Sequence, residues 1–141
     1  MSIPGTDGQK MSKSKNNIID IFLDEQKLKK QIQSIKTDST PIEKPKEWKT
    51  CNLFKIYKLV GSKDQIKKLQ LNYEKGGYGY GHAKQDLLEL ILTKYSKERK
   101  EFDYYMNNQD EIDAILKVGA KKALQTADDV LNRVRKKLGY N

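Results

Sequence analysis

The sequence has few of the residues that build metal centres and disulfides. Among its 141 residues are one cysteine, Cys51, and one histidine, His82. A lone cysteine has no partner for an internal disulfide, and a single histidine offers no cluster of ligands, so we expect no metal site. Cys51 is therefore expected to be a packed or partly exposed thiol.

Long apolar runs are also missing. No stretch approaches the ~20 apolar residues that cross a bilayer, and the amino terminus lacks the apolar segment of a signal peptide. The sequence therefore predicts a soluble cytoplasmic protein that is not attached to a membrane. Its length is that of one domain, or of a small domain with an attached tail.

Positive charge is in excess. The chain has 28 Lys and Arg residues against 19 Asp and Glu, which gives a formal net charge of +9. Such an excess favours a polyanionic partner such as RNA or phosphates. Lysine-rich, solvated helix faces produce the same balance in many other proteins. Charge alone leaves both explanations open.

The segment with the most chemical content is Lys-Met-Ser-Lys-Ser at residues 10–14, which follows a stretch with two glycines. Lys10 and Lys13 place two ammonium groups three residues apart, and Ser12 and Ser14 add neutral donors. A loop with these groups can fold over a polyphosphate. Lysine-serine runs also occur in solvated basic tails, so the five letters alone fit either a phosphate site or such a tail.

Residues 1–15 are expected to form a loop, because proline and glycine break regular structure there. Asn16 or Asn17 can cap a short helical turn that reaches Phe22, and Asp24 can cap the helix that follows. Beyond a connector, apolar residues recur at spacings of three and four. The expected elements are a connector over residues 37–48, helices over 49–60 and 62–75, a glycine-rich turn over 76–81, and one long helix that continues to residue 107.

The last helix has the clearest pattern. Asn108 can cap the start of this helix, and the helix ends before Gly139. Small residues within the stripe predict close approach to another helix. Strand patterns are scarce, so we expect an all-α fold, a bundle of about five helices preceded by an extended loop segment. The stripe consists of Ile112, Leu116, Gly119, Ala123, Ala127, Val130, Val134 and Leu138.

Residues 5–14 read GTDGQKMSKS and are followed by Asn16 and Asn17. This run resembles the KMSKS loop of class I aminoacyl-tRNA synthetases, in the form found in the tryptophanyl-tRNA synthetase family. The tyrosyl relatives, whose loop departs from KMSKS, are less similar. Four later segments resemble the tryptophanyl family in the same order: TDS at residues 37–39, CNLFKIY at 51–57, GYGHAK at 79–84, and the final helix at 113–123.

The resemblance implies the carboxyl-terminal part of a tryptophan–tRNA ligase. The family's catalytic core is a Rossmann-type fold with a HIGH-like motif, and this sequence has neither that motif nor alternating strands and helices. We expect residues 1–15 to lie at the edge of that missing domain, 16–48 to form short helices and a connector, and 49–141 to form the helical domain that contacts the anticodon. Met1 and Ser2 are interpreted as an engineered start.

The resemblance also implies the chemistry of the site. Lys10 and Lys13 would bind the ATP phosphates as catalytic residues, while Met11, Ser12 and Ser14 shape the loop. The complete enzyme would use ATP, tryptophan and tRNA(Trp), with Mg²⁺ accompanying ATP, and would be a homodimer. The fragment alone is expected to be inactive and to hold no tightly bound cofactor. In the family the last helix packs on the catalytic domain, so its stripe would be exposed here, and we expect self-association or partial disorder of the isolated chain.

Contact with the anticodon is a second hypothesis, and the sequence does not select the residues. Tyr78, Tyr80 and Trp48 could stack on bases, although packing is favoured for the two tyrosines because they flank glycines at a helix start. His82 is expected to be a helix-start residue rather than a catalyst. Alternatives are a freestanding helical RNA-binding module without catalysis and a structural interaction domain. The candidate RNA-binding lysines are Lys63, Lys67, Lys68, Lys75 and Lys84.

Overall fold

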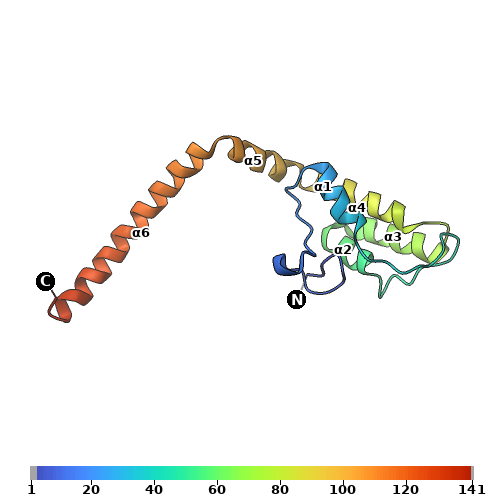
Figure 1. Ribbon diagram of the computed structural model, residues 1–141, viewed down its shortest axis with the longest axis horizontal. Coiled ribbons are helices and arrows are strands. Elements are labelled where there is room, and N and C mark those ends of the chain that lie inside the picture. Colours follow the sequence, from blue (N-terminus) through green and yellow to red (C-terminus); the bar gives the residue numbers. More distant parts are fainter. Residues whose placement is uncertain (1–2, 141) are drawn as a thin grey trace. The chain divides into compact units, whose positions relative to one another are not determined.

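Every regular element in the computed structural model, which describes residues 3–140, is helical (Figure 1). Within that range the only strand-like feature is an isolated bridge between Pro4 and Lys10. The all-α class predicted from the sequence is therefore confirmed. Met1 and Ser2, interpreted above as an engineered start, lie outside the described residues. The chain divides into two compact units, Met1–Arg99 and Lys100–Asn141, called unit 1 and unit 2 below.

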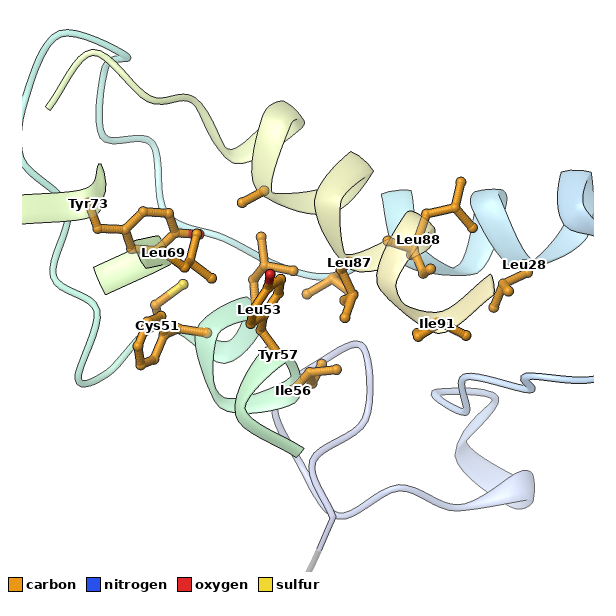
Figure 2. Packing of buried hydrophobic residues seen from close by; sticks show 14 residues of the cluster. Leu28, Cys51, Leu53, Ile56, Tyr57, Leu69, Tyr73, Leu87, Leu88 and Ile91 are labelled. Atoms are coloured by element: carbon orange, nitrogen blue, oxygen red, sulfur yellow. The ribbon is translucent and has the colours of Figure 1, made fainter. Parts of the chain in front are cut away.

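Unit 1 is built around four helices. Both α1 and α2 pack against α4, and α2 also packs against α3. Leu28 of α1 and Leu87 of α4 are fully buried in the core between them (Figure 2). Burying a leucine side chain stabilises a fold by about 1.5–3 kcal/mol, so each of these two side chains contributes substantially to the stability of the unit. The helices are α1 (Glu25–Gln33), α2 (Asn52–Val60), α3 (Lys63–Lys75) and α4 (Tyr80–Lys94).

The predicted helix ends of unit 1 are largely confirmed. The Asp24 carboxylate accepts a hydrogen bond from a backbone N–H in the first turn of α1. Ser62 and Gln65 form a reciprocal capping box at the start of α3. Gly76 ends α3 with a φ of +76°, and a Cβ there would lie 2.5 Å from the Glu43 carbonyl oxygen, so only glycine fits. Helix α2 begins at Asn52, three residues later than expected.

Two sequence predictions about helices are wrong. No helical turn runs from Asn16 or Asn17 to Phe22, because the Asn17 side chain bonds within the preceding loop instead of capping. The single long helix is divided at Tyr95 into α4 and α5 (Ser96–Asn107). The apolar spacing continues across this break, so periodicity alone does not reveal it.

The cap predicted for the last helix is also wrong. Asn108 occupies the N-cap position of α6 (Gln109–Lys137) but makes no side-chain capping bond. Its Nδ2 donates to the Tyr104 carbonyl oxygen of α5 at 2.7 Å instead. The asparagine side chain therefore pairs with a backbone carbonyl at the end of α5 rather than with a backbone N–H at the start of α6.

The connector over residues 37–48 has no helix or strand, as predicted, yet it is well anchored. Lys46 is buried, and its Nζ donates to the Pro41 carbonyl oxygen at 3.2 Å and lies 5.3 Å from the Tyr80 ring centroid. The Tyr80 hydroxyl donates to Asp38 Oδ1 at 2.9 Å. Burial raises the pKa of Tyr80, so the hydroxyl stays protonated as a donor.

Helix α6 forms most of unit 2, and its apolar side chains are exposed. Leu116 is 61% exposed, and Val130 and Val134 are 45% and 44% exposed. The helix predicted from the sequence is thus confirmed, while the expected close partner for its small-residue stripe is absent from the described part of unit 2. Among residues 3–140, no helix is both long and apolar enough to cross a bilayer.

Candidate functional site

The five residues predicted to bind ATP phosphates all lie in residues 3–17, called the lysine loop below. The first part of this loop is a small hairpin. Gly5 N–H donates to the Gln9 carbonyl oxygen at 2.7 Å, and Met11 N–H donates to the Ile3 carbonyl oxygen at 2.8 Å. The chain thereby returns to the point where the loop begins.

The second part of the lysine loop turns back on the hairpin. A short 3-10 helix, Lys13–Lys15, is closed by Asn16, which adopts a left-handed φ of 50° and donates its N–H to the Lys13 carbonyl oxygen. The backbone carbonyl of Asn17 then accepts a hydrogen bond from Thr6 N–H at 2.9 Å. Asparagine tolerates the left-handed region better than most residues, which explains its place at this turn.

The side chain of Asn17 occupies the centre of the lysine loop and is 2% exposed. Its Nδ2 donates to Asp7 Oδ1 at 2.7 Å and to the Lys10 carbonyl oxygen at 3.1 Å. Its Oδ1 accepts from Ser12 N–H at 2.8 Å. A Cβ at Gly5 would lie 2.5 Å from Asn17 Cγ, so the missing side chain at Gly5 makes room for this amide.

The base of the lysine loop is attached to the helices of unit 1. Asn52, the first residue of α2, donates from Nδ2 to the Gly5 carbonyl oxygen at 2.9 Å. Lys36 N–H, just after α1, donates to the Thr6 carbonyl oxygen at 2.8 Å. Met11 lines an apolar hollow, so the middle of the loop is also anchored. Other residues lining this hollow include Ile3, Pro4, Ile56, Leu59 and Ile91.

The two predicted phosphate ligands point their charge to solvent. Lys10 and Lys13 are both exposed, and neither has an ion-pair partner among residues 3–140. Lys15 differs, because its Nζ donates to Gln9 Oε1 at 2.8 Å. The ammonium groups of Lys10 and Lys13 are therefore free to bind a ligand, whereas that of Lys15 is hydrogen-bonded within the loop.

The neutral groups of the motif are arranged around these lysines. The hydroxyls of Ser12 and Ser14 lie 2.8 Å apart and hydrogen-bond to each other. The hydrogen bond from Asn17 is the main cause that lowers the pKa of Asp7, and its carboxylate therefore stays ionised near neutral pH. The arrangement can hold an anion through two mobile cations and a hydroxyl pair.

Sequence reasoning missed three residues that shape this site: Asn17, Gly5 and Asn52. Asn17 was interpreted as a helix cap, although its side chain is the internal brace of the loop. Two clues were present in the sequence. Asparagine is one of the few residues that tolerate a left-handed turn, and glycine is often found where the backbone approaches another group closely. Nothing in the sequence indicates that Asn52 reaches back across 47 positions.

The aromatic candidates for base stacking are packed within unit 1. Tyr80 and Tyr73 meet edge to face at 5.8 Å, and Trp48 packs on Phe54 at 5.3 Å. Tyr78 donates its hydroxyl to Asp86. These contacts agree with the packing role favoured for the two tyrosines and extend it to Trp48. His82 is exposed in the first turn of α4, consistent with the helix-start role expected for it.

Four of the five lysines proposed for RNA contact share one helix. Lys84 is different, because its Nζ donates to the Gln33 carbonyl oxygen at the end of α1 at 2.7 Å, and burial lowers its pKa. It therefore joins α4 to α1 rather than presenting a free charge. The four exposed lysines of α3 are Lys63, Lys67, Lys68 and Lys75.

Comparison with known proteins places this chain in a family. Residues 2–96 match the model of the tRNA synthetases of class I (W and Y). A tryptophan–tRNA ligase of Campylobacter jejuni strain RM1221 is 45% identical over 137 residues, 97% of this chain and 43% of the relative. A ligase of the same name from Fusobacterium nucleatum is 42% identical over 97% of this chain and 42% of the relative. The chain thus spans less than half the length of these relatives.

A solved structure agrees with the sequence matches. The crystal structure of tryptophanyl-tRNA synthetase from Campylobacter jejuni complexed with ADP and tryptophan matches with a TM-score of 0.95 at 45% identity, covering 99% of this chain and 44% of that one. A second structure of the C. jejuni protein matches with a TM-score of 0.91. This chain therefore belongs to the class I tRNA synthetases for tryptophan and tyrosine, and within them to the tryptophanyl-tRNA synthetase family.

Proposed function

We propose that this chain is the carboxyl-terminal part of a tryptophan–tRNA ligase, and that its lysine loop binds the ATP phosphates while tryptophan is activated. The observation that carries the proposal is the presentation of two unpaired ammonium groups, Lys10 and Lys13, on a loop braced from within. The similarity to ligases that include one solved with ADP and tryptophan supports the same assignment.

The chemistry requires positive charge at the departing phosphates. The tryptophan carboxylate attacks the α-phosphorus of ATP, the bond to the bridging oxygen breaks, and pyrophosphate leaves with the electron pair. Negative charge builds up on the leaving group, where Lys10 and Lys13 can stabilise it more strongly than in the ground state. Ser12 and Ser14 supply neutral donors, and Met11 holds the segment on its apolar hollow.

Mg²⁺ would accompany ATP through its phosphates rather than bind a protein cage. The lysine loop offers ammonium and hydroxyl groups, and its one carboxylate, Asp7, already accepts hydrogen bonds from Asn17 and Gln9. The tryptophan pocket and the nucleotide fold would lie in the part of the enzyme that this chain does not contain.

The exposed face of α6 fits a partner supplied by the rest of the enzyme. Its apolar stripe includes Val130, Leu131 and Val134, which line an open apolar hollow with Ala123, Thr126 and Ala127. We propose that this face packs on the catalytic domain, as the resemblance implies. The complete enzyme is proposed to be a homodimer.

A chimeric ligase tests the catalytic proposal. This chain replaces the segment of the C. jejuni ligase to which it is similar, and tryptophan-dependent ATP–pyrophosphate exchange is measured for the chimera and for the isolated chain. We expect exchange from the chimera and none from the isolated chain, because the loop needs a nucleotide fold beside it. A folded chimera that bound tRNA(Trp) but exchanged no pyrophosphate would favour the RNA-binding module instead.

The helical region is proposed to contact the anticodon of tRNA(Trp), with the lysines of α3 supplying phosphate contacts. Replacing Lys63, Lys67, Lys68 and Lys75 with glutamine should weaken tRNA binding by the chimera and flatten its dependence on salt, since each lost phosphate contact removes about one unit from the salt slope. The same change at Lys117, Lys121, Lys122 and Lys136 of α6 removes the same number of charges and is the matched control. Equal binding of tRNA(Trp) and a tRNA with an altered anticodon would place specificity elsewhere.

A further inference from the structure

Asn17 has the most deeply buried polar side chain of the lysine loop, and it bonds to the backbone on both sides of Met11. We infer that Asn17 is a positioning residue for tryptophan activation, whose carboxamide holds the backbone between Lys10 and Ser12 in the shape that presents both ammonium groups. This inference rests on the proposed function of the loop. Asn17 itself is buried and acts only through the backbone that it binds.

The chemistry of the contacts requires a carboxamide. Three hydrogen bonds use both N–H groups and the oxygen of the side chain: Oδ1 accepts from Ser12 N–H, and Nδ2 donates to the Lys10 carbonyl and to Asp7. A carboxylate of the same shape has no donor, and it would face two acceptors. An aliphatic side chain would remove all three hydrogen bonds, so the Lys10 carbonyl and the Ser12 N–H would each lose their bond to this side chain, while Asp7 Oδ1 would keep the bond from Gln9 N–H.

The bonded groups belong to the motif itself. The Lys10 carbonyl and the Ser12 N–H flank Met11, so the amide fixes the two peptide groups on either side of that residue. Lys13 follows directly and begins the 3-10 helix. A change in this backbone therefore moves both lysines relative to each other, and misplacement of a binding group by about 1 Å can cost 100-fold in rate.

The loop also contains space made for this side chain. Gly5 has no Cβ, and one built there would collide with the Asn17 carboxamide at 2.5 Å. The left-handed backbone of Asn16 and the hydrogen bond from Thr6 N–H turn Asn17 inward. Two neighbouring asparagines thus differ completely in environment, which provides a matched control within the chain.

Attachment of the loop does not depend on the Asn17 side chain. The base is held by Asn52 Nδ2 on the Gly5 carbonyl and by Lys36 N–H on the Thr6 carbonyl. The hairpin retains the bond from Met11 N–H to the Ile3 carbonyl. Loss of the amide should therefore release the segment around Lys10 to Ser12 while unit 1 stays folded, which separates a positioning role from a purely structural one.

The test uses the chimeric ligase with Asn17→Asp, and Asn16→Asp as the control that adds the same charge at an exposed site. We expect kcat for ATP–pyrophosphate exchange to fall about 10- to 100-fold for Asn17→Asp. The KM for tryptophan and the melting temperature should stay close to the parent values. Asn16→Asp should exchange within about twofold of the parent, because its side chain does not brace the loop.

Rescue sharpens the test. Adding Asp7→Asn to Asn17→Asp introduces an amide that can donate to the new carboxylate, so part of the lost kcat should return. Asn17→Ser is uncharged and smaller, and it serves if the aspartate variant does not fold; its kcat should fall at least tenfold. Nuclear magnetic resonance should show faster exchange of the Ser12 amide in each single Asn17 variant.

The outcomes distinguish the inference from the function on which it rests. If Lys13→Ala slows exchange while folded Asn17→Asp does not, the positioning role is wrong and the proposed function stands. If Lys13→Ala leaves exchange unchanged, the proposed function fails, and this inference fails with it. A parallel rise of the tryptophan KM and loss of thermal stability in Asn17→Asp would overturn positioning in favour of a general structural role.

Discussion

Unit 1 buries one face of each of its helices, whereas α6 in unit 2 leaves its apolar face exposed. Leu87 of α4 is fully buried, and Leu116 of α6 is 61% exposed, although both stand in apolar stripes of similar spacing. The pattern of a stripe determines that a helix forms and which face is apolar. The pattern does not say what covers the face, and the described residues of unit 2 supply no cover for α6.

The largest expected difference between the units is in large-to-small substitution. Leu87→Ala should lower the free energy of unfolding by about 2–5 kcal/mol, because it opens a cavity in a packed core. Leu116→Ala should change it by less than about 0.5 kcal/mol in the isolated chain, since the side chain is mostly in water already. Chemical denaturation followed by circular dichroism measures both. A cost above 2 kcal/mol for Leu116→Ala would mean that the face is covered.

Replacing a glycine with alanine should destabilise unit 1 and stabilise unit 2. Gly5→Ala places a Cβ within 2.6 Å of the Asn17 backbone and side chain, and overpacking of this kind costs about 1–3 kcal/mol. Gly119→Ala meets no atom within 4 Å inside α6 and should stabilise that helix by about 0.5–1 kcal/mol. Thermal unfolding measures both changes, and the same sign for both would contradict the contrast.

Alkaline pH should weaken unit 1 through one buried tyrosine and two partly buried ones. Burial is the main cause that raises the pKa of Tyr73, Tyr78 and Tyr80 above the usual 10.0. Their stabilising effect is fully present below about pH 10 and is lost as the pH rises towards the raised values. In unit 2, Tyr104 is exposed, and its pKa is raised chiefly by its hydrogen bond to Glu111. A pH titration followed by tyrosinate absorbance should show that these three tyrosines ionise only as unit 1 loses its tertiary structure. Ionisation of all tyrosines while unit 1 stays folded would contradict this prediction.

The smallest expected effect concerns one hydroxyl in the core. The Tyr73 hydroxyl is buried without a hydrogen-bond partner among the described residues. Tyr73→Phe removes this unpaired group and should leave the stability of unit 1 unchanged or raise it by up to about 1 kcal/mol. Tyr80→Phe is the control, because it removes a donor to Asp38 and should be destabilising. A clear loss of stability from Tyr73→Phe would show that the hydroxyl has a partner.

Capping residues and glycines predicted most helix ends in unit 1. The predictions failed at Tyr95 and at Asn108. Ser62 with Gln65, and Gly76 after α3, behave as their local sequence indicates. At Tyr95 the apolar spacing runs on although the helix breaks, and at Asn108 the side chain bonds backwards to α5. The failure at Asn108 arises because its side chain bonds to the preceding helix instead of the following one, whereas the periodicity of the sequence contains no signal for the break at Tyr95.

The sequence indicates which residues belong to the candidate site, but it does not show how the loop that holds them is folded. Lys10 and Lys13 were identified from their spacing, and their exposure is what a phosphate ligand needs. The brace by Asn17, the clearance at Gly5 and the reach of Asn52 depend on three-dimensional closure of the loop, which no spacing rule encodes. The sequence therefore predicts the groups that we propose would meet a ligand, and the structure shows the side chains that hold the loop around them.

The most direct test of the account compares two lysines of one loop. Lys13 is exposed and unpaired, whereas Lys15 is bonded to Gln9. In the chimeric ligase, Lys13→Ala should lower kcat for tryptophan-dependent ATP–pyrophosphate exchange roughly 100-fold, a loss of about 3 kcal/mol of transition-state stabilisation, with little change in the KM for tryptophan. Lys15→Ala should lower kcat far less. Equal exchange rates for the two variants would contradict the assignment of Lys13 to the ATP phosphates.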